Sequence, residues 1–547
     1  MARVEEPVRK PMRGVWLVLS LLAASALAQE RPDEAAMFGG PEEAGADAGV
    51  RPSEDSMFGG ADDVPSADAG APAVAIPTDD RDLGQLFGKA VESKFDTGEI
   101  QSDALKIGGT LNLFMQGFWQ EGRPFEEGAF SAPMLFDLYL DGRPNERVRG
   151  YVGVRLQYDP TRPTGETERL TNANLGTASV VGLTLTPPQN PAFFLDQLWL
   201  RFDIARKVFL TIGRQKVRWG VSRIWYPTDF LNSRPRDPFN PFDVRLGVNM
   251  VKVHVPVESL GWNFYAYGIM DAVTVDNNGI TVGELGGAVR AEFVLGPAEL
   301  GLGGIWQKGR RPRYAIDLSS AVGPVDVYAE AAFRDARDFV LFRYPDDLSS
   351  DNIISKLPEI EPYRPTGLFV QVSGGVSWQF NYTDKNFGIL TLEYFYNPAG
   401  YTDVLGYQVK TFGPGLFGVT LDPIQNVALY GGMHNVALSL AAPGIPGADW
   451  ITVSLSNVVI INDPAAISRL DVIFRVLNYL NVQAFAGLLY GQTGGQMRFQ
   501  VSSQLINDIA NLSDAVEPGT GDQVRDSLGP LRYPPILQAG VLLRLAI

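Results

Sequence analysis

Ten charged residues stand close together between positions 214 and 245, in a stretch that is also rich in Trp, Pro and Asn. Seven are basic and three are acidic: Arg214, Lys216, Arg218, Arg223, Arg234, Arg236, Arg245, Asp229, Asp237 and Asp243. Guanidinium groups bind carboxylates and phosphates through paired hydrogen bonds, so the cluster predicts one of two chemistries. The basic groups either attract anionic or sugar-like solutes, or they pair with nearby carboxylates and fix the stretch in place.

The chain is poorly supplied with the residues that catalysis and metal binding use most. It has no Cys, and its two His residues are His254 and His434. The absence of Cys removes disulfides, thiolate metal sites and Cys nucleophiles. Neither His lies near a Ser-rich motif, so a membrane-embedded hydrolase that uses His254 is the weaker alternative. The sequence predicts no enzyme, no cofactor and no metal site.

Residues 1–28 have the pattern of an export signal peptide. Four basic residues precede an apolar run at 15–27, and Ala26-Leu27-Ala28 supplies the small-x-small cleavage pattern. The apolar run is shorter than the roughly 20 residues of a spanning helix, and no longer run follows it. We therefore expect an exported protein without membrane-spanning helices.

Residues 29–103 form a predicted acidic tail. They hold 18 acidic and 5 basic residues, a net charge of −13 out of −16 for the whole chain. Such a charged segment with few apolar residues is predicted to be disordered, here in the periplasm. The acidic balance also disfavours nucleic acid as a partner.

A duplicated phrase in this tail, RPDEAAMFGG (31–40) and RPSEDSMFGG (51–60), sets two Met-Phe pairs twenty residues apart. We interpret Met37, Phe38, Met57 and Phe58 as a candidate docking motif for a periplasmic or lipoprotein partner. The alternative is an accidental duplication in a spacer. Residues 83–95 have the spacing of a short periplasmic or plug helix.

From Lys106 onward the sequence alternates with period two, which is typical of strands with two different faces. Val251, Val253 and Val255 fall on one face, and Lys252 and His254 on the other. Eighteen such runs are predicted, at 106–120, 133–141, 148–158, 192–204, 207–214, 246–257, 260–270, 284–295, 298–308, 312–318, 324–334, 367–380, 386–396, 428–441, 449–459, 468–476, 481–491 and 534–547.

The connections between these runs alternate in length. Every link from an even to an odd run is short, whereas the long links, at 159–191, 215–245, 335–366, 397–427 and 492–533, all run from odd to even. Short periplasmic turns and long external loops are typical of bacterial outer-membrane barrels, which have even strand numbers. The sequence thus predicts an all-β fold over residues 104–547, a transmembrane antiparallel barrel of about 18 strands. Sixteen strands are the alternative.

Two further patterns bear on this prediction. A soluble propeller or sandwich is the competing fold, but no blade-like repeat is present. Aromatic residues near the ends of the runs resemble the girdles that barrels place at the two membrane interfaces. They are Trp119, Trp199, Trp262, Trp306, Tyr394, Tyr396 and Trp450.

On this count residues 215–245 are the third external loop. An eighteen-stranded barrel is wide enough to leave an aqueous lumen. A loop so rich in Pro and aromatic residues is predicted to fold into that lumen as a constriction, where its charges act on passing solutes at short range.

Several segments resemble porin-like outer-membrane barrel families that are loosely related to alginate-export and phosphate-selective porins. GRQKVRWG (213–220), followed by YPTDFLN and DPFNPFD, is similar to their "GRQ…WG…P-x-D…NP" segment, and EYFYNPAGY (393–401) and residues 455–491 are similar to their later strands. The resemblance covers most of residues 106–547 and implies an outer-membrane channel. It transfers no catalytic residue, because one fold carries many functions.

Two functions remain open from the sequence. The first is a porin-like channel for small solutes or for the export of polysaccharide, surrounded by outer-membrane lipid. The alternative is an outer-membrane anchor of a multiprotein envelope machine, for secretion, polysaccharide export or gliding motility, docked through the acidic tail.

Overall fold

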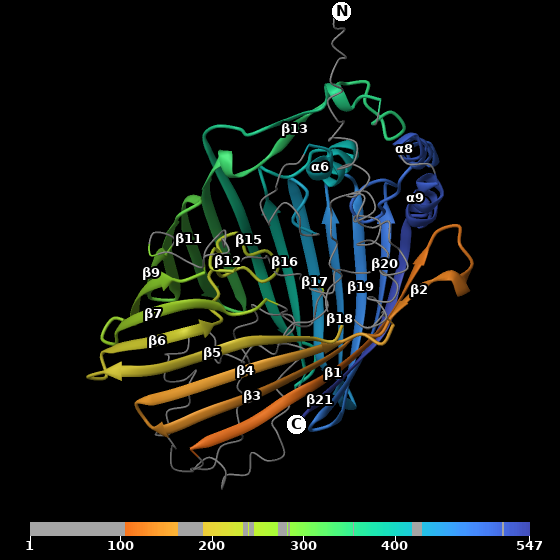
Figure 1. Ribbon diagram of the computed structural model, residues 1–547. Coiled ribbons are helices and arrows are strands. Elements are labelled where there is room, and N and C mark those ends of the chain that lie inside the picture. The colour runs from red at the N-terminus through yellow and green to blue at the C-terminus, as the bar shows by residue number, and fades with distance from the viewer. Residues whose placement is uncertain are drawn as a thin grey trace, which may run out of the picture.

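The computed structural model describes residues 104–161, 190–232, 239, 245–271, 282, 285–353, 355–384, 386–417, 429–516 and 519–547. In these ranges nineteen strands join one antiparallel sheet, and eighteen of them close into a barrel (Figure 1). The nineteenth, β2 (Ala129–Ser131), pairs with β1 beside the barrel wall. The predicted eighteen-stranded barrel is confirmed. The predicted signal peptide, acidic tail, docking motif and helix at 83–95 lie outside the described residues.

The barrel strands follow one another around the wall in chain order. They are β1 (Leu105–Gln120), β3 (Met134–Asn145), β4 (Val148–Tyr158), β5 (Ala192–Ile204), β6 (Val208–Gln215), β7 (Val248–Val257), β8 (Trp262–Ile269), β9 (Gly286–Leu295), β10 (Ala298–Gln307), β11 (Arg310–Val322), β12 (Val325–Asp335), β15 (Leu368–Asn381), β16 (Phe387–Tyr396), β17 (His434–Ile445), β18 (Ala448–Ile460), β19 (Ala465–Leu477), β20 (Leu480–Gly491) and β21 (Pro535–Ala546). The sheet closes where β1 pairs with β21, with Thr110 opposite Ala546.

The two faces of the wall differ in polarity, as period-two alternation requires. On β12, Tyr328 and Glu330 point inward and are buried, whereas Val327 points outward and is 43% exposed. On β7, His254 is buried and its neighbour Val255 is exposed, which confirms the predicted faces of that strand. On these two strands polar side chains therefore face the lumen, and exposed apolar ones face out.

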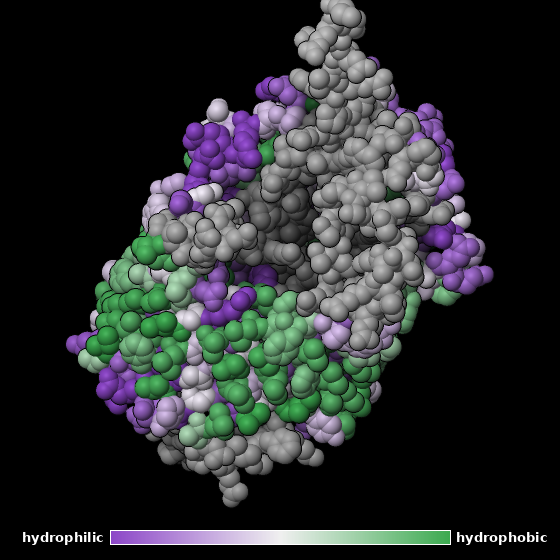
Figure 2. All heavy atoms as spheres, viewed as in Figure 1, coloured by the Kyte–Doolittle hydropathy of each residue, from purple (hydrophilic) through white to green (hydrophobic). Residues whose placement is uncertain are grey.

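Outward positions carry large apolar side chains all around the barrel. Examples are Leu198, Leu200, Ile212, Val289, Leu302, Leu318, Val327, Val376, Leu392, Leu438, Leu440, Leu455, Leu470 and Leu488, all exposed. Figure 2 shows hydrophobic residues gathered in a band over the strands of the visible face, with hydrophilic residues above it. Soluble proteins rarely expose so much contiguous apolar surface.

One of the aromatic residues predicted to lie in the interfacial girdles, Trp199, faces the lumen instead. Trp306 and Tyr394 are exposed on outward positions, as expected. Trp199 instead pairs with Tyr151 across β4 and β5 and stacks on its ring, on the inward face that it shares with Arg201. The position of Trp199 near the end of a strand is compatible with an inward or an outward side chain, and only the pairing register of the strand decides which face it occupies.

Three long loops pack together into a cap at one end of the barrel (Figure 1). These loops contain α6 (Val404–Phe417), α8 (Ser503–Val516) and α9 (Thr520–Leu528), and the hairpin of β13 (Leu341–Arg343) and β14 (Glu361–Tyr363). Four short 3-10 helices also lie in loops of the described chain, at Phe125–Glu127, Ala336–Asp338, Leu357–Glu359 and Gly529–Arg532. The cap has its own buried core, formed by Leu348, Ile353, Ile360, Val409, Phe499, Val501, Leu505, Ile506, Ile509, Leu528 and Leu531. In the described ranges, no helix has the length and apolarity needed to cross a membrane.

Candidate pore loop

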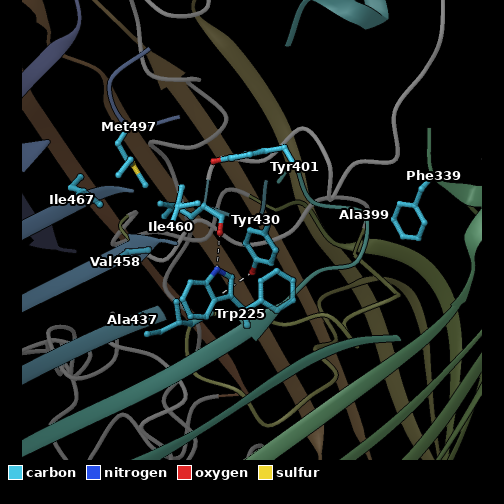
Figure 3. Packing of buried hydrophobic residues seen from close by; sticks show 14 residues of the cluster. Trp225, Phe339, Ala399, Tyr401, Tyr430, Ala437, Val458, Ile460, Ile467 and Met497 are labelled. Atoms are coloured by element: carbon cyan, nitrogen blue, oxygen red, sulfur yellow. Dashed lines mark hydrogen bonds between the residues drawn. The ribbon is translucent and has the colours of Figure 1, made fainter. Parts of the chain in front are cut away.

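After β6 the chain leaves the wall and runs along the inside of the barrel. Trp219 and Phe230 are buried against inward side chains of β7 to β12, among them Met250 and Tyr267. Further along, Trp225 packs in a second cluster with side chains of β16 to β19 (Figure 3). The pore loop, defined here as residues 216–232, therefore follows the inner wall around much of the barrel.

Glu330, on the inward face of β12, holds the first turn of the pore loop by its main chain. The backbone N–H groups of Val221 and Ser222 donate to its Oε2 at 2.7 and 3.1 Å, and that of Thr228 donates to its Oε1 at 3.3 Å. Gly220 lies against the same carboxylate with a φ of 98°, and a Cβ there would lie 2.3 Å from Oε2. Glycine is therefore required for this close approach.

Glu393, on the inward face of β16, holds the next three residues in the same way. The backbone N–H groups of Arg223, Ile224 and Trp225 donate to its carboxylate at 2.9, 3.1 and 2.8 Å. The hydroxyls of Tyr328 and Ser373 also donate to it, each at 2.9 Å.

The Glu393 side chain is fully buried. Five donors surround its carboxylate, which is how a protein stabilises a charge that is removed from water. Glu330 and Glu393 together are called the carboxylate clamp below.

Side chains of the pore loop add contacts to the same wall. The Arg223 guanidinium donates to Ser377 on β15 and pairs with Asp326 on β12 at 2.9 Å. The Trp225 indole N–H donates to the carbonyl of Leu429 at 2.9 Å. Figure 3 shows Trp225 beside Tyr430, whose hydroxyl donates to the carbonyl of Ile224. The tip of the loop is thus fixed by main chain and side chains alike.

Other charged residues of the loop form ion pairs, one of them with Arg245 outside the loop. Lys216 lies 2.9 Å from Asp196 on β5, and Arg245 lies 2.7 Å from Asp229. Asn232 also donates to Asp229, and burial raises the pKa of that carboxyl while the Arg245 guanidinium opposes the rise. The Arg218 guanidinium lies over the Tyr226 ring.

Of the ten charged residues predicted to form the constriction, Lys216, Arg218, Arg223 and Asp229 lie in the pore loop, and Arg245 lies beside Asp229; each has its own partner. Arg214 is placed differently: it is in register with Leu198, on the face that carries Ile212 and Leu200. The other four, Arg234, Arg236, Asp237 and Asp243, lie outside the described residues.

The two wall glutamates were not identified from the sequence. Each stands alone in a run of apolar or small residues, at VYAEAAF (327–333) and TLEYFY (391–396). A single carboxylate at an inward position of such a strand is the signal that could have marked them, because a buried charge needs donors.

The two histidines have structural surroundings. His254 Nε2 lies 2.9 Å from Asn263 Oδ1, and its ring stacks between Phe209 and Tyr265. His254 thus lies on the inward face of β7, among structural neighbours. His434 Nδ1 lies 2.7 Å from the Tyr394 hydroxyl. Within the described ranges, no group of three or more His, Cys, Asp and Glu residues could hold a metal ion.

No protein-family model and no curated protein matches the chain. Several variants of the porin of Rhodopseudomonas blastica are similar solved structures. The first of them is 9% identical, with a TM-score of 0.35, over 81% of this chain and 100% of the porin. A structure described as "Asymmetric conductivity of engineered proteins" is 10% identical with a TM-score of 0.34, at the same coverage of both chains. Likeness at this level carries no conclusion about function.

Proposed function

We propose that this chain is a porin-like outer-membrane channel for small hydrophilic solutes, narrowed by the pore loop. One observation carries the proposal: a closed barrel with an apolar outer surface holds a loop inside it by two buried wall glutamates. A loop fixed in this way reduces the cross-section of the lumen without moving, which suits passive passage with a size limit.

The outer surface supports a location in a bilayer. Backbone groups in lipid must be satisfied internally, and a closed antiparallel barrel does so without leaving an edge. The apolar outward belt and the polar inward face are the arrangement that such barrels have in the bacterial outer membrane.

The ion pairs favour structural fixation over anion attraction for two basic residues of the pore loop and for Arg245, which pairs with it. Lys216, Arg223 and Arg245 each have a carboxylate partner within 3 Å. A paired cation presents little net field to a passing anion. The proposed channel therefore selects by size and hydrogen bonding more than by charge.

A second candidate is an anchor of an envelope machine, including one for polysaccharide export. The packed cap of α6, α8 and α9 favours it, because a folded surface over one end of a barrel suits a bound partner or a closed state. The tail that would dock a periplasmic partner lies outside the described residues.

Single-channel conductance of the refolded barrel in a planar bilayer tests the proposal. The intact protein should show open steps, and replacement of residues 221–232 by a short Gly-Ser linker should enlarge them. A closed intact protein that opens only in the variant would favour the anchor or a gated exporter. The absence of conductance in both proteins would overturn the proposed channel function.

A further inference from the structure

After the pore loop, the chain reaches the wall of β16 to β19 a second time, at Phe239. The loop ends close to where it began, because the side-chain amide of Asn232 donates to the carbonyl of Val217 at 3.0 Å. Phe239 then packs against the buried cluster that side chains of β16 to β19 form. Arg245 lies back beside Asp229, at 2.7 Å. The chain therefore contacts this wall twice before β7 begins.

The second contact is made by Arg469, on the inward face of β19. Its Nη1 donates to the carbonyl of Phe239 at 2.7 Å. The arginine is buried, with 4% of its surface exposed, and hydrogen bonds from a charged donor are stronger than neutral ones. Because the acceptor is a main-chain group, this bond does not depend on which side chain stands at the position of Phe239.

Neighbouring wall residues fix the direction of the Arg469 guanidinium. Its Nε and Nη2 donate to Oδ1 of Asp471, two residues along the strand, at 3.0 and 2.8 Å. Gln483 on β20 donates to the same oxygen at 2.8 Å. The guanidinium also lies over the Phe485 ring, 4.1 Å from its centroid. These contacts hold the planar group in one orientation, in which Nη1 reaches Phe239.

The two contacts with the wall use opposite ends of the peptide group. The carboxylate clamp accepts hydrogen bonds from the backbone N–H groups of residues 221–225. Arg469 instead donates to a backbone carbonyl. Because Asp471 lies against its guanidinium, the arginine adds little net field to the lumen. Its geometry suits a structural anchor better than the attraction of an anion.

We propose that Arg469 is a positioning residue of the constriction, which fixes a second segment of the chain inside the lumen at Phe239. This inference rests on the proposed channel and adds a further part to its narrow region. The clamp fixes the pore loop, and Arg469 fixes the chain that follows it. Loss of Arg469 therefore frees Phe239 while the pore loop stays in place, and the lumen widens beside β19.

A single thiol can test the anchor, because the chain has no Cys. The test measures how fast a charged methanethiosulfonate reagent modifies Phe239→Cys in the detergent-solubilised full chain. The intact background is compared with one that carries Arg469→Met and Asp471→Asn together. This double change leaves no unpaired buried charge, so the barrel should still fold. The rate should rise about tenfold, the effect of losing one hydrogen bond from a charged group.

Three further variants serve as controls. Ser222→Cys, which lies at the carboxylate clamp, should react at the same rate in both backgrounds. Arg475→Gln, which changes an exposed arginine of the same strand, should leave the rate of Phe239→Cys unchanged. Arg469→Lys should give an intermediate rate, because a lysine can reach the carbonyl but cannot bind Asp471 through two nitrogen atoms.

Single-channel recording with polyethylene glycols of graded size then tests the role in the constriction. The largest polymer that enters should be larger for the double variant and unchanged for Arg475→Gln. An unchanged labelling rate of Phe239→Cys overturns the anchor. Faster labelling with an unchanged size limit overturns its role in the constriction and leaves the channel standing. If no variant conducts, the channel is overturned instead, and the labelling rates still decide whether Arg469 holds Phe239.

Discussion

Inward carboxylates accept hydrogen bonds from different partners on two sides of the lumen. On the wall of β12 and β16, Glu330 and Glu393 accept hydrogen bonds mainly from the main chain of the pore loop. On the wall of β3 to β5, Asp137 and Asp141 accept them from Arg155 and Arg149 of the neighbouring strand. The carboxylates of β12 and β16 thus hold the pore loop, whereas those of β3 join neighbouring strands of the wall.

Removal of Glu393 should break this comparison most strongly. Glu393→Ala leaves three backbone amides and the hydroxyls of Tyr328 and Ser373 without their acceptor, at about 1–3 kcal/mol for each buried group that stays unsatisfied. We expect the loop to detach and the conductance to rise severalfold, with faster amide exchange at 223–225. Glu359→Ala, in the exposed part of the cap, is the control. An unchanged exchange rate in Glu393→Ala would show that side-chain packing alone holds the loop.

Glu330→Gln is the milder form of the same experiment. The amide oxygen can still accept from Val221 or Ser222, but the second oxygen of the side chain is replaced by an NH₂ donor. Because at least one backbone N–H group of the loop then lacks its acceptor, the loop should lose about 1–2 kcal/mol of local stability. Amide exchange at Val221 and Ser222 measures the change. Exchange that rises equally at 223–225, which Glu393 holds, would mean that the two glutamates do not act at separate points.

Arg223→Lys should have a smaller effect. A lysine can reach either Asp326 or Ser377 but cannot bind both with the fixed geometry of a guanidinium. Asp326 is 42% exposed at its side chain, so solvent weakens the ion pair, and we expect a loss of about 1 kcal/mol. Thermal unfolding compares this variant with Arg343→Lys, whose pair with Glu361 is exposed and which should be neutral. Equal effects of the two variants would contradict an anchoring role for Arg223.

A change of pH should affect the cap and not the pore loop. Burial in α6 lowers the pKa of Lys410 from 10.5 to about 7, and its ammonium lies against the carbonyl of Gly431 and the Tyr401 ring. Between these two pKa values the unfolded lysine holds a proton that the folded one has lost. The stability of α6 packing therefore rises as the pH rises from about 7 towards 10.5 and is lost again on acidification.

Amide exchange over residues 404–411, corrected for intrinsic rates and followed from pH 6.5 to 9, measures this slope. Lys410→Met should abolish it. Lys356→Met, which changes a partly exposed lysine of the same cap that pairs with Asp347 and Glu359, should leave it unchanged. A slope that persists in Lys410→Met would assign the pH response to another group.

The barrel could be predicted from the sequence because each strand carries its own evidence. The alternation of Val251, Val253 and Val255 with polar neighbours is local, and so is the contrast of short and long connections. The contacts of the pore loop are not local. Nothing near Val221 indicates that its amide meets Glu330, and nothing near Trp199 fixes the face on which it lies. The cap was missed for a different reason: the helical spacing of Leu505, Ile506 and Ile509 was present, but the segment was interpreted as an external loop.

The carboxylate clamp also has a consequence for the order of folding. Glu330 follows Val221 by 109 residues, Glu393 follows Arg223 by 170, and Leu429 follows Trp225 by 204. Contacts between residues so far apart form late, because the chain between them must first be ordered. The pore loop therefore has no binding surface until β12 and β16 stand in the wall. During assembly the barrel passes through a stage with a wider lumen, and narrowing is among its last steps.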